Sequence, residues 1–310
     1  MSEEVEQWCV KVPLSEGESK RRELISSGLA DRNFRPRAEN GFLLIPVLSE
    51  IDGAVREIFK ETQAREELAR HEQVGGIVIL QDDDVEGAKK ILAARPSVHT
   101  ALFATSPVEG EFRTKTFKVL AGVDTTETIY TEYGKRMIVD MTAAYFSARL
   151  SNERQRLLSL MREGENILDM FCGVGPFPVM LGAKAGFVVA NDINPSAVYL
   201  LQKNLGLNRL KNVVPMVGDA KNLPYELGDL KFDRIIMNLP FDAYEFLEAA
   251  SKLAKPNAII HLYSLVEKDG EHMEDIRRAF PDAVITEKFI RSYSPTSWHA
   301  VYDIETGYEV

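Results

Sequence analysis

The sequence predicts an α/β protein in which a doubly wound, mostly parallel sheet is preceded by two small α/β domains. From residue 151 onward, short apolar stretches alternate with helical stretches. This alternation is typical of parallel strands joined by right-handed crossovers. Before residue 145, the strands and helices form two shorter groups. The chain has 310 residues, which is enough for two or three domains.

Composition and charge are those of an ordinary globular protein. Hydrophobic residues make up 45% and charged residues 27%. No apolar run approaches the roughly 20 residues that span a bilayer, and the acidic N-terminus has no apolar signal core. Cys9 and Cys172 match no disulfide or zinc pattern, and no histidine has the spacing of a metal ligand. We therefore expect a cytoplasmic protein without a membrane partner.

The net charge of −10 argues against a protein that coats nucleic acid without specificity. A local basic face can still contact phosphates while the rest of the surface stays acidic. Such cations cluster in the N-terminal region: Lys20, Arg21, Arg22, Arg32, Arg35 and Arg37.

The first predicted domain covers residues 1–62. Its expected elements are a strand, a helix that ends near Gly28 and a second strand, at 8–14, 17–28 and 41–47. Residues 49–72 are rich in Glu, Arg and Ala, so we expect a helical linker with a solvated charged face there.

The second predicted domain covers residues 70–144. A short buried-type strand is followed by a helix and then by further strands, at 75–80, 86–95, 98–105, 111–122 and 127–141.

The third predicted domain covers residues 145–310. Ser151 is expected to cap a helix that stops before Gly164. Strands are then expected at 166–171, 187–192, 213–219, 232–240 and 258–265. Helices are expected to begin at Pro176, Pro195 and Phe241.

The first of these strands runs into a glycine-rich turn. Asp169 is followed closely by Gly173 and Gly175, and such a turn lets a ligand approach the backbone. The dinucleotide fingerprint requires a third glycine where this chain has Pro178, which counts against NAD. An acidic strand end before Gly-x-Gly instead resembles the first motif of S-adenosylmethionine-dependent methyltransferases, whose cationic ligand suits a carboxylate-rich turn.

Polar residues also end the next strands. Asp192 can accept hydrogen bonds from ribose hydroxyls, and Asp219 can accept one from an adenine amino group. The fourth strand ends in Asn238-Leu239-Pro240. Each feature alone is weak, because turns and helix caps use the same residues. All four at successive carboxyl strand ends predict a Rossmann-like class I methyltransferase domain rather than a general nucleotide site.

Several longer stretches resemble a known family. The tetrapeptide Asn238-Leu239-Pro240-Phe241 nearly matches the Asn-Pro-Pro-Phe signature of enzymes that methylate exocyclic amines, but Leu239 departs from it. The chain resembles, over nearly its whole length, the archaeal and eukaryotic type of tRNA (guanine(37)-N1)-methyltransferase. The stretches that carry this resemblance are 9–13, 108–122, 132–141, 145–154, 169–177, 191–195 and 237–247.

The resemblance implies methyl transfer from S-adenosylmethionine to N1 of guanosine 37 in tRNA, which gives 1-methylguanosine. The N-terminal module would contact the outer corner of the tRNA. The related enzyme that transfers an aminocarboxypropyl group to the tricyclic base differs where this chain has Asn-Leu-Pro, which favours methyl transfer. Magnesium is compatible with the sequence but not indicated by it. We expect a monomer that needs no obligate protein partner.

The resemblance also implies roles for individual residues. N1 of guanine carries a proton, so a base is needed, and Glu153 lies in the first turn of a helix where the dipole favours the ionised carboxylate. Arg113 would stabilise negative charge on O6. Asn238 and Pro240 would hold the base near the donor, and Tyr145 would stack on the base or position it. The expected donor-binding residues are Arg154, Asp169, Phe171, Gly173, Gly175, Asp192, Ile193, Asp219, Ala220 and Asn238.

Ordinary structural roles compete with these assignments. A Glu beside an Arg at a helix start is often surface charge, and Arg113 in an alternating strand would by default be solvated. Cys172 is compatible with a pyrimidine C5 type of nucleophile, but a small residue in a glycine turn more often serves packing.

Three other functions stay open from the sequence. The first is methylation of an exocyclic amine on RNA, DNA or protein, against which Leu239 argues. The second is a non-catalytic RNA-binding protein, which predicts damaged donor or base positions. The third is a bifunctional enzyme that also methylates the tricyclic base derived from 1-methylguanosine.

Overall fold

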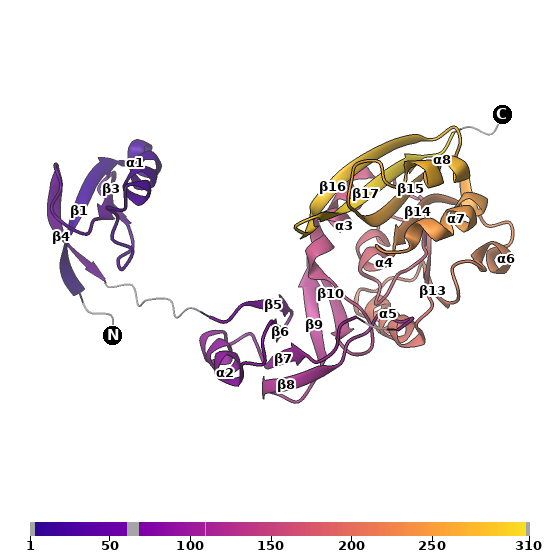
Figure 1. Cartoon of the computed structure of the whole chain (residues 1–310), viewed down its shortest axis with the longest axis horizontal. Helices are drawn as coiled ribbons and strands as arrows, with labels where there is room; N and C mark the ends of the chain where they lie inside the picture. Colours follow the sequence, from indigo (N-terminus) through magenta and orange to yellow (C-terminus); the bar gives the residue numbers. More distant parts are fainter. Residues whose placement is uncertain (1–3, 61–67, 109, 308–310) are drawn as a thin grey trace. The chain divides into compact units, whose positions relative to one another are not determined.

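The computed structural model describes residues 4–60, 68–108 and 110–307 (Figure 1). The chain divides into two compact units, Met1–Leu68 and Ala69–Val310.

The first unit is a four-stranded antiparallel sheet with one helix. The strand order is β2-β3-β1-β4, so the first strand lies in the interior of the sheet. Its elements are β1 (Glu4–Pro13), α1 (Leu14–Ser26), β2 (Arg37–Glu39), β3 (Phe42–Pro46) and β4 (Ala54–Lys60). Cys9 packs against Phe34, Leu44 and Phe59 in one part of the core.

The predicted helical linker over residues 49–72 is wrong where the structure describes it. Residues 54–60 form strand β4, and β5 begins at His71. Val55, Ile58 and Phe59 are β-branched or aromatic residues that favour a pleated strand, and Phe59 is buried. Pairing with β1 supplies the backbone partners of β4, and the charged residues Arg56 and Lys60 stay exposed on the strand. The middle of the predicted linker, residues 61–67, lies outside the described residues.

The second unit begins with a four-stranded sheet in the order β5-β6-β7-β8. Its elements are β5 (His71–Val74), β6 (Ile77–Leu80), α2 (Val85–Ala94), β7 (Thr100–Ala104) and β8 (Phe117–Gly122). Asp84 caps the helix by accepting a hydrogen bond from the Gly87 amide at 2.8 Å. The strand predicted from residue 111 starts only at Phe117, because the backbone turns at Arg113, where φ is +53°.

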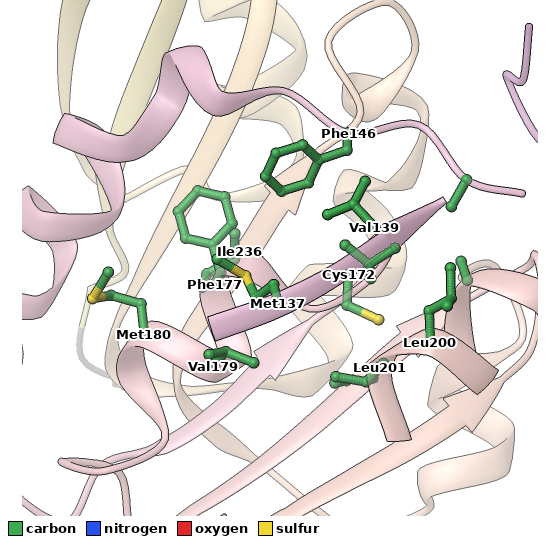
Figure 2. Packing of buried hydrophobic residues seen from close by; sticks show 14 of the residues in the cluster. Met137, Val139, Phe146, Cys172, Phe177, Val179, Met180, Leu200, Leu201 and Ile236 are labelled. Carbon is green, nitrogen blue, oxygen red and sulfur yellow. The ribbon is translucent and has the colours of Figure 1, made fainter. Parts of the chain in front are cut away.

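A hairpin of β9 (Glu127–Glu132) and β10 (Lys135–Asp140) follows and packs into a larger core. Figure 2 shows Met137 and Val139 of β10 among Phe177, Met180 and Leu201. The buried side chain of Asn204 adds hydrogen bonds to both the amide and the carbonyl of Ile138, at 2.6 and 3.0 Å. The predicted domain boundary at residue 144 comes directly after this hairpin. The apolar side chains of the hairpin nevertheless pack in the same core as the sheet that follows.

That sheet has seven strands in the order β13-β12-β11-β14-β15-β17-β16. The first five run parallel, and β17 and β16 form an antiparallel hairpin at the other edge (Figure 1). The strands are β11 (Asn166–Asp169), β12 (Phe187–Asp192), β13 (Val213–Val217), β14 (Phe232–Asn238), β15 (Ala254–Val266), β16 (Val284–Ser294) and β17 (Ser297–Glu305). The predicted doubly wound, mostly parallel sheet is confirmed, whereas the C-terminal hairpin was not among the predicted elements.

Helices connect these strands. They are η1 (Ala148–Leu150), α3 (Ser151–Leu160), α4 (Pro176–Leu181), α5 (Pro195–Leu207), α6 (Leu223–Leu227), η2 (Ala243–Phe246), α7 (Leu247–Leu253) and α8 (Met273–Ala279). The predicted capping role of Ser151 is wrong, because the helical backbone of α3 follows directly from η1 and no side chain caps α3. Ser147 caps the preceding turn instead, by accepting a hydrogen bond from the Arg149 amide at 3.3 Å.

Within the residues that the structure describes, no helix is both long and apolar enough to cross a membrane.

Candidate functional site

A cavity of about 1050 Å³ lies at the carboxyl ends of the parallel strands of the second unit. This is the edge at which doubly wound sheets bind ligands, because loops diverge there on either side of the sheet. The predicted site residues that line the cavity are Arg113, Tyr145, Arg154, Phe171, Gly173, Asp192, Ile193, Asp219, Ala220, Asn238 and Pro240. The predicted site residues Glu153, Asp169 and Gly175 lie outside its lining.

The glycine turn after β11 depends on two residues with positive φ. Gly173, with φ of +54°, donates its amide to Asp192 Oδ2 at 2.7 Å and lines the cavity. Gly175, with φ of +88°, lies so close to α5 that a Cβ there would stand 2.2 Å from Leu201 Cδ1. Gly173 therefore leaves space on the ligand side, whereas Gly175 allows the turn to pack against the helix behind it.

Replacing Gly175 by Ala is expected to destabilise the protein by roughly 2 kcal/mol or more, because a left-handed backbone and an overlap with Leu201 both oppose the new methyl group. Urea denaturation measures the change. Gly206→Ala is the control, since Gly206 lies within α5 with open space around it and should gain ~0.5–1 kcal/mol. Equal stabilities of the two variants would contradict this account of the turn.

Three buried oxygens at the strand ends have no hydrogen-bond partner within the described residues. They are Asp169 Oδ2, Asn191 Oδ1 and Asn238 Oδ1, at the ends of β11, β12 and β14. Asn191 and Asn238 line the cavity, and because buried polar atoms are rarely left unpaired, these two acceptors fit a ligand that brings hydrogen-bond donors. The amino groups of S-adenosylmethionine are donors of this kind, and the residues present therefore fit this ligand.

Asn191 is a site residue that sequence reasoning missed. Its side chain is 1% exposed, and Nδ2 donates to the carbonyls of Met170 and Gly218 at 3.1 and 3.0 Å. Asn191 thereby holds together the ends of β11 and β13 on either side of its own strand. The signal in the sequence was an amide near the end of an otherwise apolar strand.

The acidic groups of the turn are strongly desolvated. Burial raises the pKa of Asp169 from its ordinary 3.8 to about 8, and the nearby charge of Asp192 adds to this effect. Burial also raises the pKa of Asp192, although backbone amides of Asn194 and Gly173 donate to its carboxylate. Burial raises the pKa of the Cys172 thiol as well, so this residue is a packing group with little thiolate character.

The raised pKa of Asp169 makes stability depend on pH. Between about pH 4 and pH 8 the folded protein holds a proton on Asp169 that the unfolded chain releases. The contribution of Asp169 to the free energy of unfolding is therefore complete below pH 4 and is lost as the pH approaches 8. Asp169→Asn should remove this loss, so the variant gains stability relative to wild type between pH 5 and pH 8. Urea denaturation across this range tests it, with the exposed Asp229→Asn as control. A pH dependence of Asp169→Asn that parallels wild type would contradict it.

Arg154 lines the cavity but is itself held by an acid. Its side chain is 1% exposed, and Nε donates to Glu132 Oε1 at 2.6 Å while Nη2 donates to Glu132 Oε2. The hydroxyl of Tyr130 donates to the same carboxylate at 3.0 Å. The guanidinium is thus fixed between helix α3 and the β9–β10 hairpin, and its charge is compensated before any ligand binds.

The loop after β14 carries the Asn-Leu-Pro motif and meets Arg113. The carbonyl of Pro240 accepts a hydrogen bond from the Leu265 amide at 2.7 Å, which ties the loop to the end of β15. The Arg113 guanidinium lies 4.5 Å from the centre of the Phe241 ring and 3.9 Å from Asp242. The structure therefore brings Arg113 into contact with the loop that follows Asn238.

Glu153 lies outside the cavity lining and takes part in an ion-pair network. Arg156 Nε donates to Glu153 Oε2 at 2.8 Å, and the Tyr263 hydroxyl lies 3.4 Å from the same oxygen. Arg156 also donates to Asp303 Oδ2 at 2.7 Å, and Asp303 Oδ1 lies 2.6 Å from His261 Nδ1. The Glu153 carboxylate is therefore held in place by its neighbours, and Leu150 of η1 and Arg154 of α3 line the cavity.

Comparison with known proteins places this geometry in a family. The model of the TRM5/TYW2 methyltransferase domain matches residues 128–286, and that of the tRNA methyltransferase 5 N-terminal domain matches residues 9–55. The tRNA (guanine(37)-N(1))-methyltransferase Trm5b of Pyrococcus abyssi is 37% identical, over 97% of this chain and 99% of its own length. In the structural comparison, the crystal structure of that Trm5b superposes with a TM-score of 0.76 at 34% identity, and covers 97% of this chain and 100% of that chain.

Two further relatives cover most of the chain. The structure of a complex of aTrm5 and tRNALeu superposes with a TM-score of 0.70 at 28% identity, over 96% of this chain and 99% of that chain. The tRNA 4-demethylwyosine(37)-methyltransferase Taw21 of Saccharolobus solfataricus is 34% identical, over 82% of this chain and its full length, 100%. The cavity, the strand-end residues and these matches agree, and the chain belongs to the TRM5/TYW2 methyltransferase family.

Proposed function

We propose that this protein transfers a methyl group from S-adenosylmethionine to N1 of guanosine 37 in tRNA. The observation that carries the proposal is a single cavity, lined on one side by the strand-end residues of a methyl-donor site and on another by Arg113 and the Asn238-Leu239-Pro240 loop. The relatives that match nearly the whole chain are enzymes with this activity.

The donor would lie over the ends of β11, β12 and β13. Asp192 is placed to accept hydrogen bonds from ribose hydroxyls, and Asp219 to accept one from an adenine amino group. Phe171, which packs edge-on against Phe246 with ring centres 4.9 Å apart, gives this part of the cavity an apolar wall. When bound, S-adenosylmethionine supplies an electrophilic methyl group on a sulfonium.

The acceptor chemistry falls to Glu153, Arg113 and Asn238. N1 of guanine holds a proton that must leave, and negative charge then develops on O6. Glu153 takes the proton, and Arg113 stabilises the charge through the fixed hydrogen-bond donors of its guanidinium. Asn238 holds the base through the side-chain oxygen that lacks a partner within the described residues.

For this role the Glu153 carboxylate must turn from Arg156 towards the cavity. Glu153 directly precedes Arg154, which lines the cavity. Catalytic hydrogen bonds often form only in the complex with substrate. Until then Arg156 holds the carboxylate through the ion pair at 2.8 Å.

The tRNA would also contact the first unit. Arg32 and Arg35 are exposed and form no ion pair within the described residues. Lys20, Arg21 and Arg22 pair with glutamates on the surface of α1, and such pairs are weak enough for phosphates to replace them. We propose that residues 1–62 recognise the outer corner of tRNA and that one chain suffices, because the donor residues all come from a single chain.

The experiment that tests the proposal is transfer of labelled methyl to unmodified tRNA transcripts that carry guanosine or adenosine at position 37. Label recovered as 1-methylguanosine from the first transcript alone is the expected result. Label on an exocyclic amine would contradict it and support an amino-methyltransferase. A tRNA with the tricyclic base is the third substrate, because the similarity to Taw21 makes a second activity on that base the specific alternative.

A further inference from the structure

The cavity extends beyond the parallel strands onto the C-terminal hairpin. Leu265 of β15 pairs with His299 of β17, and His299 pairs with Arg291 of β16. Residues in direct register point to the same face of a sheet, and all three line the cavity. They form a continuous wall, which we call the hairpin wall. Its residues take no part in the proposed donor binding or proton removal.

The imidazole of His299 is a buried polar group without a partner. Its side chain is 3% exposed, and Nε2 has no hydrogen-bond partner within the described residues. Burial and the neighbouring charge of Arg291 lower the pKa of His299 to about 4. The ring is therefore neutral at pH 7, and its Nε2 can donate a hydrogen bond to a ligand hydroxyl or accept one from it.

Arg291 brings a positive charge to the hairpin wall. Its guanidinium forms no ion pair with any described residue, and Nε is buried without a partner. By contrast, Arg154, Arg156 and Arg234 in the same unit are paired with carboxylates. A partly buried guanidinium without an acid beside it favours an anionic ligand.

Tyr293 completes the wall at the cavity rim. It is exposed, and its ring packs edge-on against Phe241 with ring centres 6.2 Å apart. The hairpin wall thus meets the Asn-Leu-Pro-Phe loop, where the Arg113 guanidinium packs over the Phe241 ring. An exposed aromatic ring beside a cation is the usual surface on which single-stranded nucleic acid stacks.

We infer that the hairpin wall binds the RNA strand on either side of the target nucleotide. Arg291 holds a phosphodiester, Tyr293 stacks on a neighbouring base, and His299 hydrogen-bonds a ribose hydroxyl. This inference rests on the proposed function and assigns it a substrate subsite. A base that leaves its stack draws its own backbone to the mouth of the cavity, where these groups lie.

The carboxylate of the methyl donor is the other anion that Arg291 could bind. Strand β16 lies four strands from β11 in the sheet, which at ~4.8 Å per strand is a separation of about 19 Å. Asp192 and Asp219 lie on the opposite side of β11 from β16. The donor residues and the hairpin wall are therefore at different ends of the cavity, and the anion at Arg291 is the RNA phosphate.

The test is the salt dependence of tRNA binding to the full chain, measured for wild type, Arg291→Gln and Arg277→Gln. Arg277 is an exposed cation of α8 that does not line the cavity. We expect Arg291→Gln to weaken tRNA binding by ~10-fold and to reduce the slope of log K against log salt by ~0.7, the effect of one lost phosphate contact. Arg277→Gln should match wild type, and Arg291→Lys should keep the slope.

Two further readouts identify the ligand. Donor affinity, measured by calorimetry with S-adenosylmethionine alone, should be unchanged in Arg291→Gln. His299→Phe, which keeps the volume of the ring, should raise the KM for tRNA several-fold. His299→Gln, which keeps a donor and an acceptor, should have a KM for tRNA close to that of wild type.

Weaker donor binding in Arg291→Gln would assign Arg291 to the donor site and overturn the inference. If the wild-type protein methylates guanosine 37 but Arg291→Gln shows the same salt slope as Arg277→Gln, the hairpin wall alone is overturned. A wild-type protein that neither binds nor methylates tRNA would overturn both this inference and the proposed function.

Discussion

Replacing Glu153 by Gln is expected to slow methyl transfer by ~10²–10⁴-fold, the usual contribution of a general base. The amide keeps the size of the side chain but cannot take the N1 proton at neutral pH. Single-turnover transfer, with saturating donor and tRNA, isolates this step from binding. Affinities for S-adenosylmethionine and tRNA should be unchanged, since Glu153 does not line the cavity in the free protein.

Glu163→Gln is the matched control for charge. Glu163 is exposed shortly after the end of α3, so its neutralisation should leave the rate within about twofold of wild type. The assignment of Glu153 would fail if Glu153→Gln kept a rate near that of this control. Another group lining the cavity would then have to accept the proton.

Breaking the buried pair of Arg154 and Glu132 is expected to destabilise the protein by roughly 3–5 kcal/mol. Arg154→Met leaves Glu132 as an uncompensated buried carboxylate, and Glu132→Leu leaves a buried guanidinium. The double variant removes both charges and should recover most of the lost stability, because apolar residues of similar size can fill the space. Urea denaturation of the four proteins gives the coupling energy directly.

The exposed pair of Lys252 and Glu248 on α7 is the control for this cycle. Its coupling should be far weaker than that of the buried pair, because solvent screens both charges. A buried pair that couples no more strongly than this surface pair would contradict the role of Arg154 as a clamp between α3 and the hairpin. Donor affinity should also fall in Arg154→Met, since Arg154 lines the cavity.

The donor half of the site could be predicted because its residues follow the strands in order. Asp192, Asp219 and Asn238 each come directly after or at the end of an apolar stretch, and parallel topology brings such positions to one edge. Asn191 was missed because its function is to bridge neighbouring strands, and the pairing of strands is not visible in the local sequence.

The other half of the cavity could not be predicted in this way. Arg291 and His299 lie on antiparallel strands that return to the same edge late in the chain, and their contact follows from strand register. The strand β4 was mistaken for a helix because its charges suggested a solvated helix, whereas pairing with β1 decides its conformation. In both cases the missing information is the pairing of strands that are distant in sequence.

The sequence by itself determined the alternation of strands and helices, the doubly wound sheet and the donor motif, because these depend on local periodicity and on turns that only glycine or small polar residues permit. Only the tertiary structure decided which charges are compensated. It pairs Arg154 with Glu132 and Arg156 with Asp303, while Arg291 has no acidic partner among the described residues. The strength of a Coulomb interaction depends on the distance between the charges and on their burial, and the tertiary fold sets both.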